Sequence, residues 1–127
     1  MTTQILLIAH APLASALREC VGHVFADRMN TVVALDVQAS DTAEMVLQQA
    51  KQLRQSMAGH AVLVLTDAMG ATPCNVARRL TQDTDDLVVC GVNLPMLWRA
   101  VAYQHEPLPT VAQKAVEGGQ QGVMMAP

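Results

Sequence analysis

Two side chains that could do chemistry stand at the ends of short aliphatic runs. His10 ends the run ILLIAH, and Asp67 ends the run VLVLTD. A neutral imidazole is a nucleophile through the ring nitrogen that carries no proton. A carboxylate bonded to the other ring nitrogen fixes the tautomer and favours the cation that forms after attack. If these two residues meet, they form an oriented histidine nucleophile.

The stretch DAMGATPCN, which begins at Asp67, has the composition of an anion-binding turn. Gly70 allows a tight backbone turn. Thr72 supplies a hydroxyl group and is the expected N-cap of a helix that starts at Pro73. Backbone N–H groups at the start of a helix bind anions. An oriented histidine, an anion-binding turn and a hydroxyl together favour a histidine that carries a phosphoryl group.

Each of these residues also has a purely structural explanation. A histidine after a strand can be a hydrogen-bonded edge residue, Asp67 can form an Asx-type turn, and Thr72 can simply cap the next helix. The other three histidines fall at positions typical of a protein surface: His23, His60 and His105. Because the histidines share no ligand spacing, we expect no metal site.

The elements that position these residues alternate between strands and helices. Aliphatic runs predict strands at 5–9, 32–37, 61–67 and 87–93. Apolar residues at helical spacing follow each run, and the last helix is expected around 111–117. In the second helix, Asp41 can be the N-cap, with Glu44 completing a capping box. The closing GGQQGVMMA predicts a glycine-broken turn and a short final strand.

Strand–helix alternation with nearly continuous apolar strands predicts an α/β fold. We expect one domain, residues 1–127, with a doubly wound, mostly parallel four-stranded sheet and helices on both faces. Ligands of such sheets gather beyond the carboxyl ends of the strands, at the topological switch point. If the strand order is 2-1-3-4, the first and third strands are neighbours, and His10 and Asp67 face each other at that point.

The composition of the 127 residues excludes several classes of protein. Hydrophobic residues make up 51% and aromatic residues 2%, which indicates an aliphatic core. The net charge is -3 with no basic stripe, so nucleic acid is not an expected partner. Three scattered cysteines indicate reduced thiols in a cytoplasmic protein. No apolar segment approaches the roughly 18 residues of a membrane helix, so we expect no membrane insertion.

The segments LLIAHAPLASAL, VLTDAMGATPCN and GVNLPML resemble the enzyme IIA components of the mannose-type (mannose/fructose/sorbose) bacterial sugar phosphotransferase system. The resemblance runs over essentially the whole chain. It implies a phosphotransferase component in which His10 accepts a phosphoryl group from the phosphocarrier protein HPr and passes it to a histidine of a IIB component. Asp67 would hold and polarise that histidine, and the Thr72 hydroxyl would lie near the phosphoryl group.

The resemblance also implies a binding rim and an assembly. Gly70 and Ala71 match the turn that follows the carboxylate, and Asn93 and Pro95 match the loop after the fourth strand. The family forms homodimers in which the C-terminal strand is exchanged, which would give the segment GVMMA a role. No cofactor is implied.

Two departures from the family pattern leave other functions open. Ala11–Pro12 replaces the glycine that usually follows the histidine, and Ala71 replaces a second glycine in the turn. One alternative is a regulatory module that is phosphorylated on His10 and controls a partner protein without a permease. Another is the phosphotransfer subunit of a dihydroxyacetone kinase. Sugar specificity belongs to other components of such systems, and the sequence does not name it.

Overall fold

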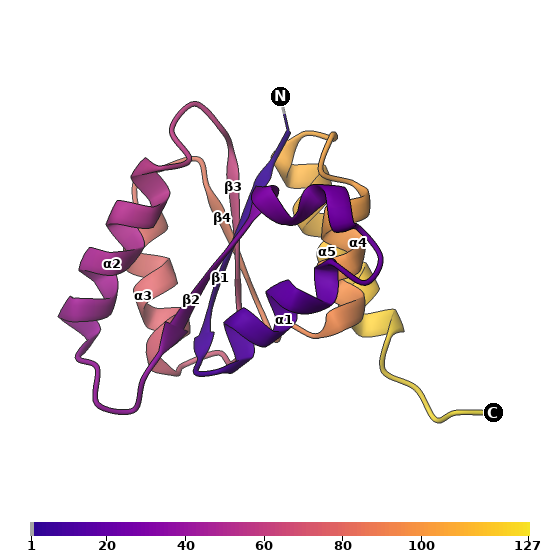
Figure 1. Cartoon of the computed structure of the whole chain (residues 1–127), viewed down its shortest axis with the longest axis horizontal. Helices are drawn as coiled ribbons and strands as arrows, with labels where there is room; N and C mark the ends of the chain where they lie inside the picture. The colour runs from indigo at the N-terminus through magenta and orange to yellow at the C-terminus, as the bar shows by residue number, and fades with distance from the viewer. Residues whose placement is uncertain (1) are drawn as a thin grey trace.

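The computed structural model describes residues 2–127 and contains a four-stranded sheet between two layers of helices (Figure 1). All neighbouring strands are parallel, and their order is β2-β1-β3-β4. This confirms the predicted sheet and its order. The strands are β1 (Gln4–His10), β2 (Val32–Val37), β3 (Val62–Thr66) and β4 (Leu87–Cys90).

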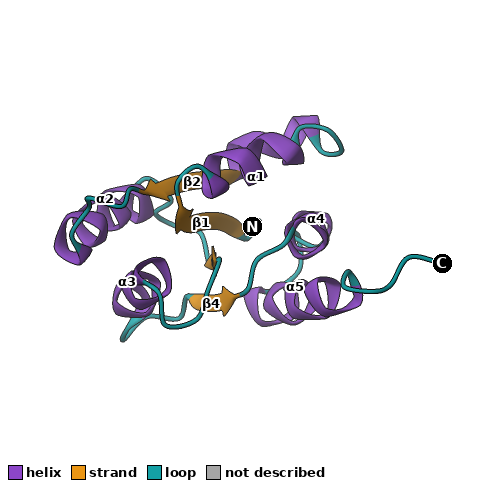
Figure 2. Ribbon diagram, turned by 90° about the horizontal axis from the view of Figure 1, so that it is seen from below, coloured by secondary structure: helices purple, strands orange, loops and turns teal. Residues whose placement is uncertain are grey.

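The helices divide between the two faces of this sheet (Figure 2). On one face lie α2 (Ala43–Gln55) and α3 (Thr72–Thr81). On the other lie α1 (Leu13–Val21), α4 (Leu94–Ala102) and α5 (Leu108–Gln121), and a short 3-10 helix, η1 (Ala26–Thr31), leads into β2. None of the helices within residues 2–127 is long and apolar enough to cross a membrane.

The two central strands are apolar on both faces, as the sequence indicates for a covered parallel sheet. In β1, Leu6 and Ile8 pack toward α2 and α3, whereas Ile5 and Leu7 pack toward α1, α4 and α5. All four side chains are fully buried. Full burial of such a side chain stabilises the fold by about 1.5–3 kcal/mol, so this alternation fixes β1 and the residue at its end, His10.

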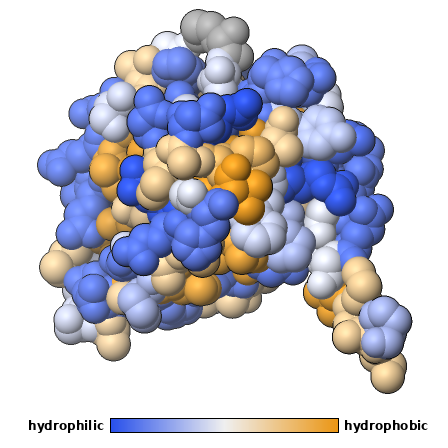
Figure 3. Space-filling model, turned by 45° about the vertical axis from the view of Figure 1, so that its right-hand side comes forward, coloured by the Kyte–Doolittle hydropathy of each residue, from blue (hydrophilic) through white to orange (hydrophobic). Residues whose placement is uncertain are grey.

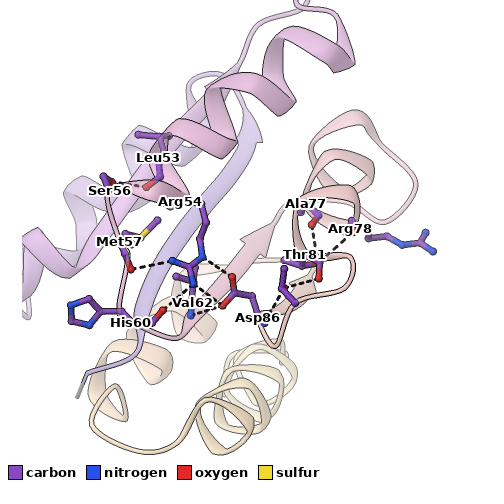
Figure 4. A network of polar contacts seen from close by, with 11 residues as sticks. Leu53, Arg54, Ser56, Met57, His60, Val62, Ala77, Arg78, Thr81 and Asp86 are labelled. Atoms are coloured by element: carbon purple, nitrogen blue, oxygen red, sulfur yellow. Dashed lines mark hydrogen bonds and ion pairs between the residues drawn. The ribbon is translucent and has the colours of Figure 1, made fainter.

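A partly buried ion pair joins the C-terminal end of α2 to Asp86, the residue before β4 (Figure 4). The Arg54 guanidinium donates to both carboxylate oxygens of Asp86, at 2.7 and 3.3 Å. It also donates to the carbonyls of Met57 and His60, and Asp86 accepts the backbone N–H of Val62. The network therefore anchors the loop into β3 at the edge opposite His10.

The start of α2 differs from the prediction. Thr42, not Asp41, is the N-cap, and its hydroxyl accepts the backbone N–H of Met45 at 3.2 Å. Asp41 instead accepts the backbone N–H of Gln38, because it belongs to the turn that precedes the helix. Glu44 pairs with Arg79 of α3 rather than completing a capping box.

Helix α3 begins one residue earlier than predicted. Thr72 is the first helical residue, and Ala71 is the N-cap in an extended conformation, without a side-chain hydrogen bond. Proline at the second helical position is compatible with this start because the first turn of a helix needs no backbone N–H there. The Thr72 hydroxyl is therefore not the cap of α3.

Strand β4 ends at Cys90 rather than at residue 93. Gly91 follows it with a φ of 87°, a backbone conformation that glycine adopts without strain. The predicted strand at 61–67 is likewise shorter, at Val62–Thr66. Asn93 is thereby placed at the start of α4 rather than within a strand.

The C-terminal region contains more helix than the sequence predicts. Gly118 and Gly119 lie inside α5 and are buried against α4, so the predicted glycine-broken turn is wrong. A Cβ atom on Gly118 would lie 2.7 Å from the Arg99 Cβ, which explains the preference for glycine at this helix contact. Residues 123–127 form no strand in the single chain, and the end of the chain projects from the body with apolar side chains exposed (Figure 3).

Candidate functional site

The structure brings His10 and Asp67 together at the carboxyl edge of the sheet. His10 is the last residue of β1, and Asp67 directly follows the last residue of the neighbouring β3. The His10 Nδ1 lies 2.7 Å from the Asp67 Oδ2, and the His10 backbone N–H donates to the same oxygen at 3.0 Å. One carboxylate oxygen therefore holds both the backbone and the ring of the histidine.

The exposure of these two side chains is very different. The His10 side chain is 56% exposed, whereas the Asp67 side chain is 13% exposed. The second oxygen of Asp67, Oδ1, is buried and has no hydrogen-bond partner within residues 2–127. The carboxylate is thus fixed behind the ring while the imidazole faces outward.

The charge of Asp67 decides which ring nitrogen is free. Burial raises the pKa of the Asp67 carboxyl, but the hydrogen bonds from the His10 backbone and ring lower it more, and the net pKa lies below its ordinary value. An ionised carboxylate only accepts hydrogen bonds. The Nδ1 of a neutral His10 therefore carries the proton, and the lone pair is on Nε2.

The turn after Asp67 leads directly into α3. Gly70 has a φ of 86°, and its carbonyl accepts the side-chain amide of Asn75 at 3.2 Å. The N–H of Ala71 donates to the carbonyl of Ala68 at 3.3 Å, which closes the turn before Thr72 begins the helix. Figure 1 shows that the loops into α1, α3 and α4 all leave the same edge of the sheet.

Asn93 and Pro95 have packing roles at the start of α4. The Asn93 side chain caps α4, since its Oδ1 accepts the N–H of Met96 at 2.9 Å. Its Nδ2 donates to the carbonyl of Gly119 in α5 at 3.1 Å. Pro95 packs so closely on Gly122 that a Cβ there would lie 2.5 Å from the proline Cγ. Binding by these two residues stays a prediction.

Sequence reasoning missed Asp36, which fixes the helix that follows His10. The Asp36 Oδ1 accepts the backbone N–H of Ser15 at 3.0 Å, and Oδ2 accepts the Ser15 hydroxyl. The N-cap residue of α1, Pro12, contributes no side-chain hydrogen bond, so Asp36 supplies the cap from β2. A single carboxylate inside the apolar run VVALDV was the signal that could have identified it.

The residue after His10 is held in place by a backbone hydrogen bond. The N–H of Ala11 donates to the carbonyl of Val37 at 2.9 Å, so the residue after His10 continues the pairing of β1 with β2. The Ala11–Pro12 peptide bond is cis.

Within residues 2–127 no three His, Cys, Asp or Glu side chains cluster closely enough to hold a metal ion.

Comparison with known proteins identifies the family. Residues 4–116 match the family described as the PTS system fructose IIA component (EIIA-man), and the chain belongs to this family. The match confirms the resemblance to mannose-type IIA components. Family membership supports a phosphocarrier role, that of a phosphotransferase component, in a sugar phosphotransferase system.

Solved structures show the same fold. The chain is similar to phosphotransferase system component EIIA from Streptococcus agalactiae, with 24% identity and a TM-score of 0.86 over 97% of this chain and 96% of that one. It is also similar to the mannose/sorbose-specific IIA subunit from Enterococcus faecalis, with 24% identity and a TM-score of 0.88 over 100% and 96%. A IIA protein associated with the fucose utilization operon of Streptococcus pneumoniae has 21% identity and a TM-score of 0.83 over 98% and 96%. No curated protein matches the sequence.

Proposed function

We propose that this chain accepts a phosphoryl group from phospho-HPr on the Nε2 of His10 and passes it to a histidine of a IIB component. The observation that carries this proposal is the 2.7 Å contact between His10 Nδ1 and the Asp67 carboxylate, behind a ring that is 56% exposed. That contact leaves Nε2 as the nucleophile. The exposure allows a second protein to approach it.

The proposed transfer moves one phosphoryl group between two histidines. The Nε2 lone pair attacks the phosphorus of the donor phosphohistidine, so that a new N–P bond forms while the donor N–P bond breaks. His10 retains its Nδ1 proton and becomes cationic, and the adjacent Asp67 carboxylate stabilises that charge. Because an N–P bond replaces an N–P bond, the step is nearly isoenergetic, and positioning contributes most of the acceleration.

The turn between β3 and α3 would bind the phosphoryl oxygens. The first turn of α3 has backbone N–H groups without helical partners, and the helix dipole is positive there. Gly70 and Ala71 supply the backbone leading to these groups, and Thr72 supplies a hydroxyl that the helix does not use as its cap. A IIB histidine would then remove the phosphoryl group by the reverse of the first step.

A homodimer with an exchanged C-terminal strand belongs to the same proposal. Val123, Met124 and Met125 are 76, 72 and 96% exposed, and within residues 2–127 β4 is an edge strand with one unpaired side. Apolar residues beside an open strand edge favour strand addition by a second chain. Light scattering of the full chain and of a chain ending at Gly122 tests this. A dimer that persists after truncation would contradict the exchange.

The primary experiment is intact mass after incubation with phosphoenolpyruvate, enzyme I and HPr. We expect an acid-labile gain of one phosphoryl group in the wild type and in His60→Ala, a matched histidine control outside the site. His10→Ala should show no gain. A gain that persists in His10→Ala, or its absence from correctly folded wild type, would refute the assignment of His10.

A regulatory role is the second candidate, favoured by Ala11–Pro12 in place of the glycine expected beside the histidine. A side chain and a proline ring there restrict how closely a partner approaches the backbone. The two roles differ in the fate of the phosphoryl group. Rapid discharge to a purified IIB component supports the relay. A stable phosphoprotein that binds a partner without discharge supports regulation, and a dihydroxyacetone kinase subunit would discharge to a kinase complex instead.

A further inference from the structure

Two of the three cysteines lie in contact at the end of β4, although they are 16 positions apart in the sequence. The Cys74 Sγ lies 2.9 Å from the Cys90 Sγ. Cys74 is the third residue of α3, and Cys90 is the last residue of β4. The third cysteine, Cys20, lies on α1 on the other face of the sheet.

We propose that Cys74 and Cys90 form a redox-active thiol pair, which a hydroperoxide oxidises to an intrachain disulfide. This modification site goes beyond the phosphocarrier function and does not depend on it. A disulfide bond is about 2.05 Å long, so closing the 2.9 Å gap requires a movement of about 0.9 Å. A hydrogen bond between the two thiols holds the sulfur atoms at this distance.

The surroundings of the two sulfurs define their order of reaction. Cys74 is fully buried, whereas Cys90 is partly exposed, so a small oxidant reaches Cys90 first. Burial raises the pKa of the Cys74 thiol, but hydrogen bonding to Cys90 and to the Gly70 backbone outweighs burial and leaves the pKa below its ordinary value. Burial and the neighbouring thiol raise the pKa of Cys90. Cys74 is therefore the better thiolate for the second step.

The proposed chemistry has two steps that balance. In the first, the Cys90 sulfur attacks the terminal oxygen of the hydroperoxide. An S–O bond forms, the O–O bond breaks, and the thiol proton passes to the departing alkoxide, which leaves as an alcohol. In the second, the Cys74 sulfur attacks the resulting sulfenic acid, the S–S bond forms, and the hydroxyl leaves as water with the Cys74 proton. Two thiols are oxidised and one peroxide is reduced.

The disulfide would tie the first turn of α3 to the end of β4. Cys90 is the register partner of Thr66, the residue before Asp67, so the link lies directly beside the strand that carries the carboxylate. It would also close the chain segment between residues 74 and 90, which restricts the unfolded state. The oxidised protein should therefore unfold at a higher temperature than the reduced protein.

Tryptic mapping of the whole chain tests the proposal, because Cys20, Cys74 and Cys90 fall in three different tryptic peptides. The native protein is treated with tert-butyl hydroperoxide, quenched in acid, alkylated in denaturant and digested without reduction. We expect a loss of two hydrogen masses and a single linked pair of peptides, those of Cys74 and Cys90, which dithiothreitol separates. Cys20→Ser should give the same pair, and Cys90→Ser should give none.

Several results would overturn the proposal. They are a linkage that includes Cys20, oxidation of isolated cysteines to sulfinic acid without any link, and three freely alkylated thiols after treatment. A sample oxidised in urea shows which linkages form without the fold, and the Cys74–Cys90 link should lose its dominance there. His10→Ala should form the link as readily as the wild type. The failure of this proposal and the failure of the phosphocarrier assignment are therefore separate outcomes.

Discussion

Replacing Asp67 with asparagine tests how much the carboxylate contributes to transfer. The side chain keeps its shape and one acceptor oxygen, but it loses the charge that, in the proposed transfer, would stabilise a phosphorylated His10. Hydrogen bonds that involve a charged group contribute about 1.5–3 kcal/mol. Because the ring is 56% exposed and solvent screens part of the effect, we take about 2 kcal/mol, which corresponds to a rate roughly thirty-fold lower.

The assay is single-turnover transfer from phospho-HPr, followed by rapid quenching and intact mass. Asp67→Asn should lower the transfer rate at saturating donor, since the loss falls on the charge that forms in the reaction and not on donor binding. Asp85→Asn, an exposed carboxylate substitution, is the matched control and should transfer at the wild-type rate. A fall of less than about threefold in Asp67→Asn would refute the stabilising role of the carboxylate.

The same carboxylate also predicts a pH dependence of stability. Its pKa in the folded protein is below the ordinary value of 3.8. A carboxyl whose pKa is lower in the folded protein than in the unfolded chain stabilises the fold at pH values above the unfolded-state pKa. This stabilisation is lost as the pH falls through the pKa of the folded protein. The difference in free energy of unfolding between wild type and Asp67→Asn should therefore be smaller well below pH 3.8 than above it. Urea titrations across this range measure it, and a difference that grows in acid would contradict the assignment.

Three further substitutions test the structure around the site. Asp36→Ala removes the cap of α1 and should cost about 1 kcal/mol, seen as a lower Tm, with slower transfer at His10 if α1 positions the histidine loop. Asp86→Asn leaves the partly exposed Arg54 guanidinium without its counter-ion and should cost about 1–3 kcal/mol in urea unfolding with little effect on the transfer rate of the folded fraction. Gly118→Ala places a Cβ 2.7 Å from the Arg99 Cβ and should cost about 1–3 kcal/mol, whereas full stability would show that α4 and α5 can separate.

The sequence predicts the site well where strand geometry alone decides it. Parallel strands end at the same edge of the sheet, so the order β2-β1-β3-β4 is enough to bring a residue after β1 beside a residue after β3. That is why His10 and Asp67 could be paired before any side-chain position was known. The order itself was a condition of the prediction, taken as a common arrangement of small doubly wound sheets.

The remaining features depend on tertiary contacts that leave no local signal. Asp41 and Thr42 are both good N-caps, and only the turn from Gln38 decides between them. From the sequence alone, Gly118 predicts the end of a helix, because glycine has a low helix propensity. In the structure it lies inside α5, where the close approach of α4 leaves no room for a side chain. The contact of Cys74 with Cys90 likewise follows from the packing of α3 on the sheet, because nothing in their spacing indicates it.

The division of burial between His10 and Asp67 favours the proposed protein donor over a small substrate. A pocket for a small molecule buries about 70–90% of the surface of its ligand. The His10 side chain lies instead at the edge of the sheet, where 56% of its own surface is exposed. An exposed ring alone would rotate and present either nitrogen. The buried carboxylate of Asp67 prevents this, since one oxygen binds both Nδ1 and the His10 backbone N–H. Nε2 thus lies on an exposed ring of fixed direction, as the proposed transfer between the histidines of two docked proteins would require.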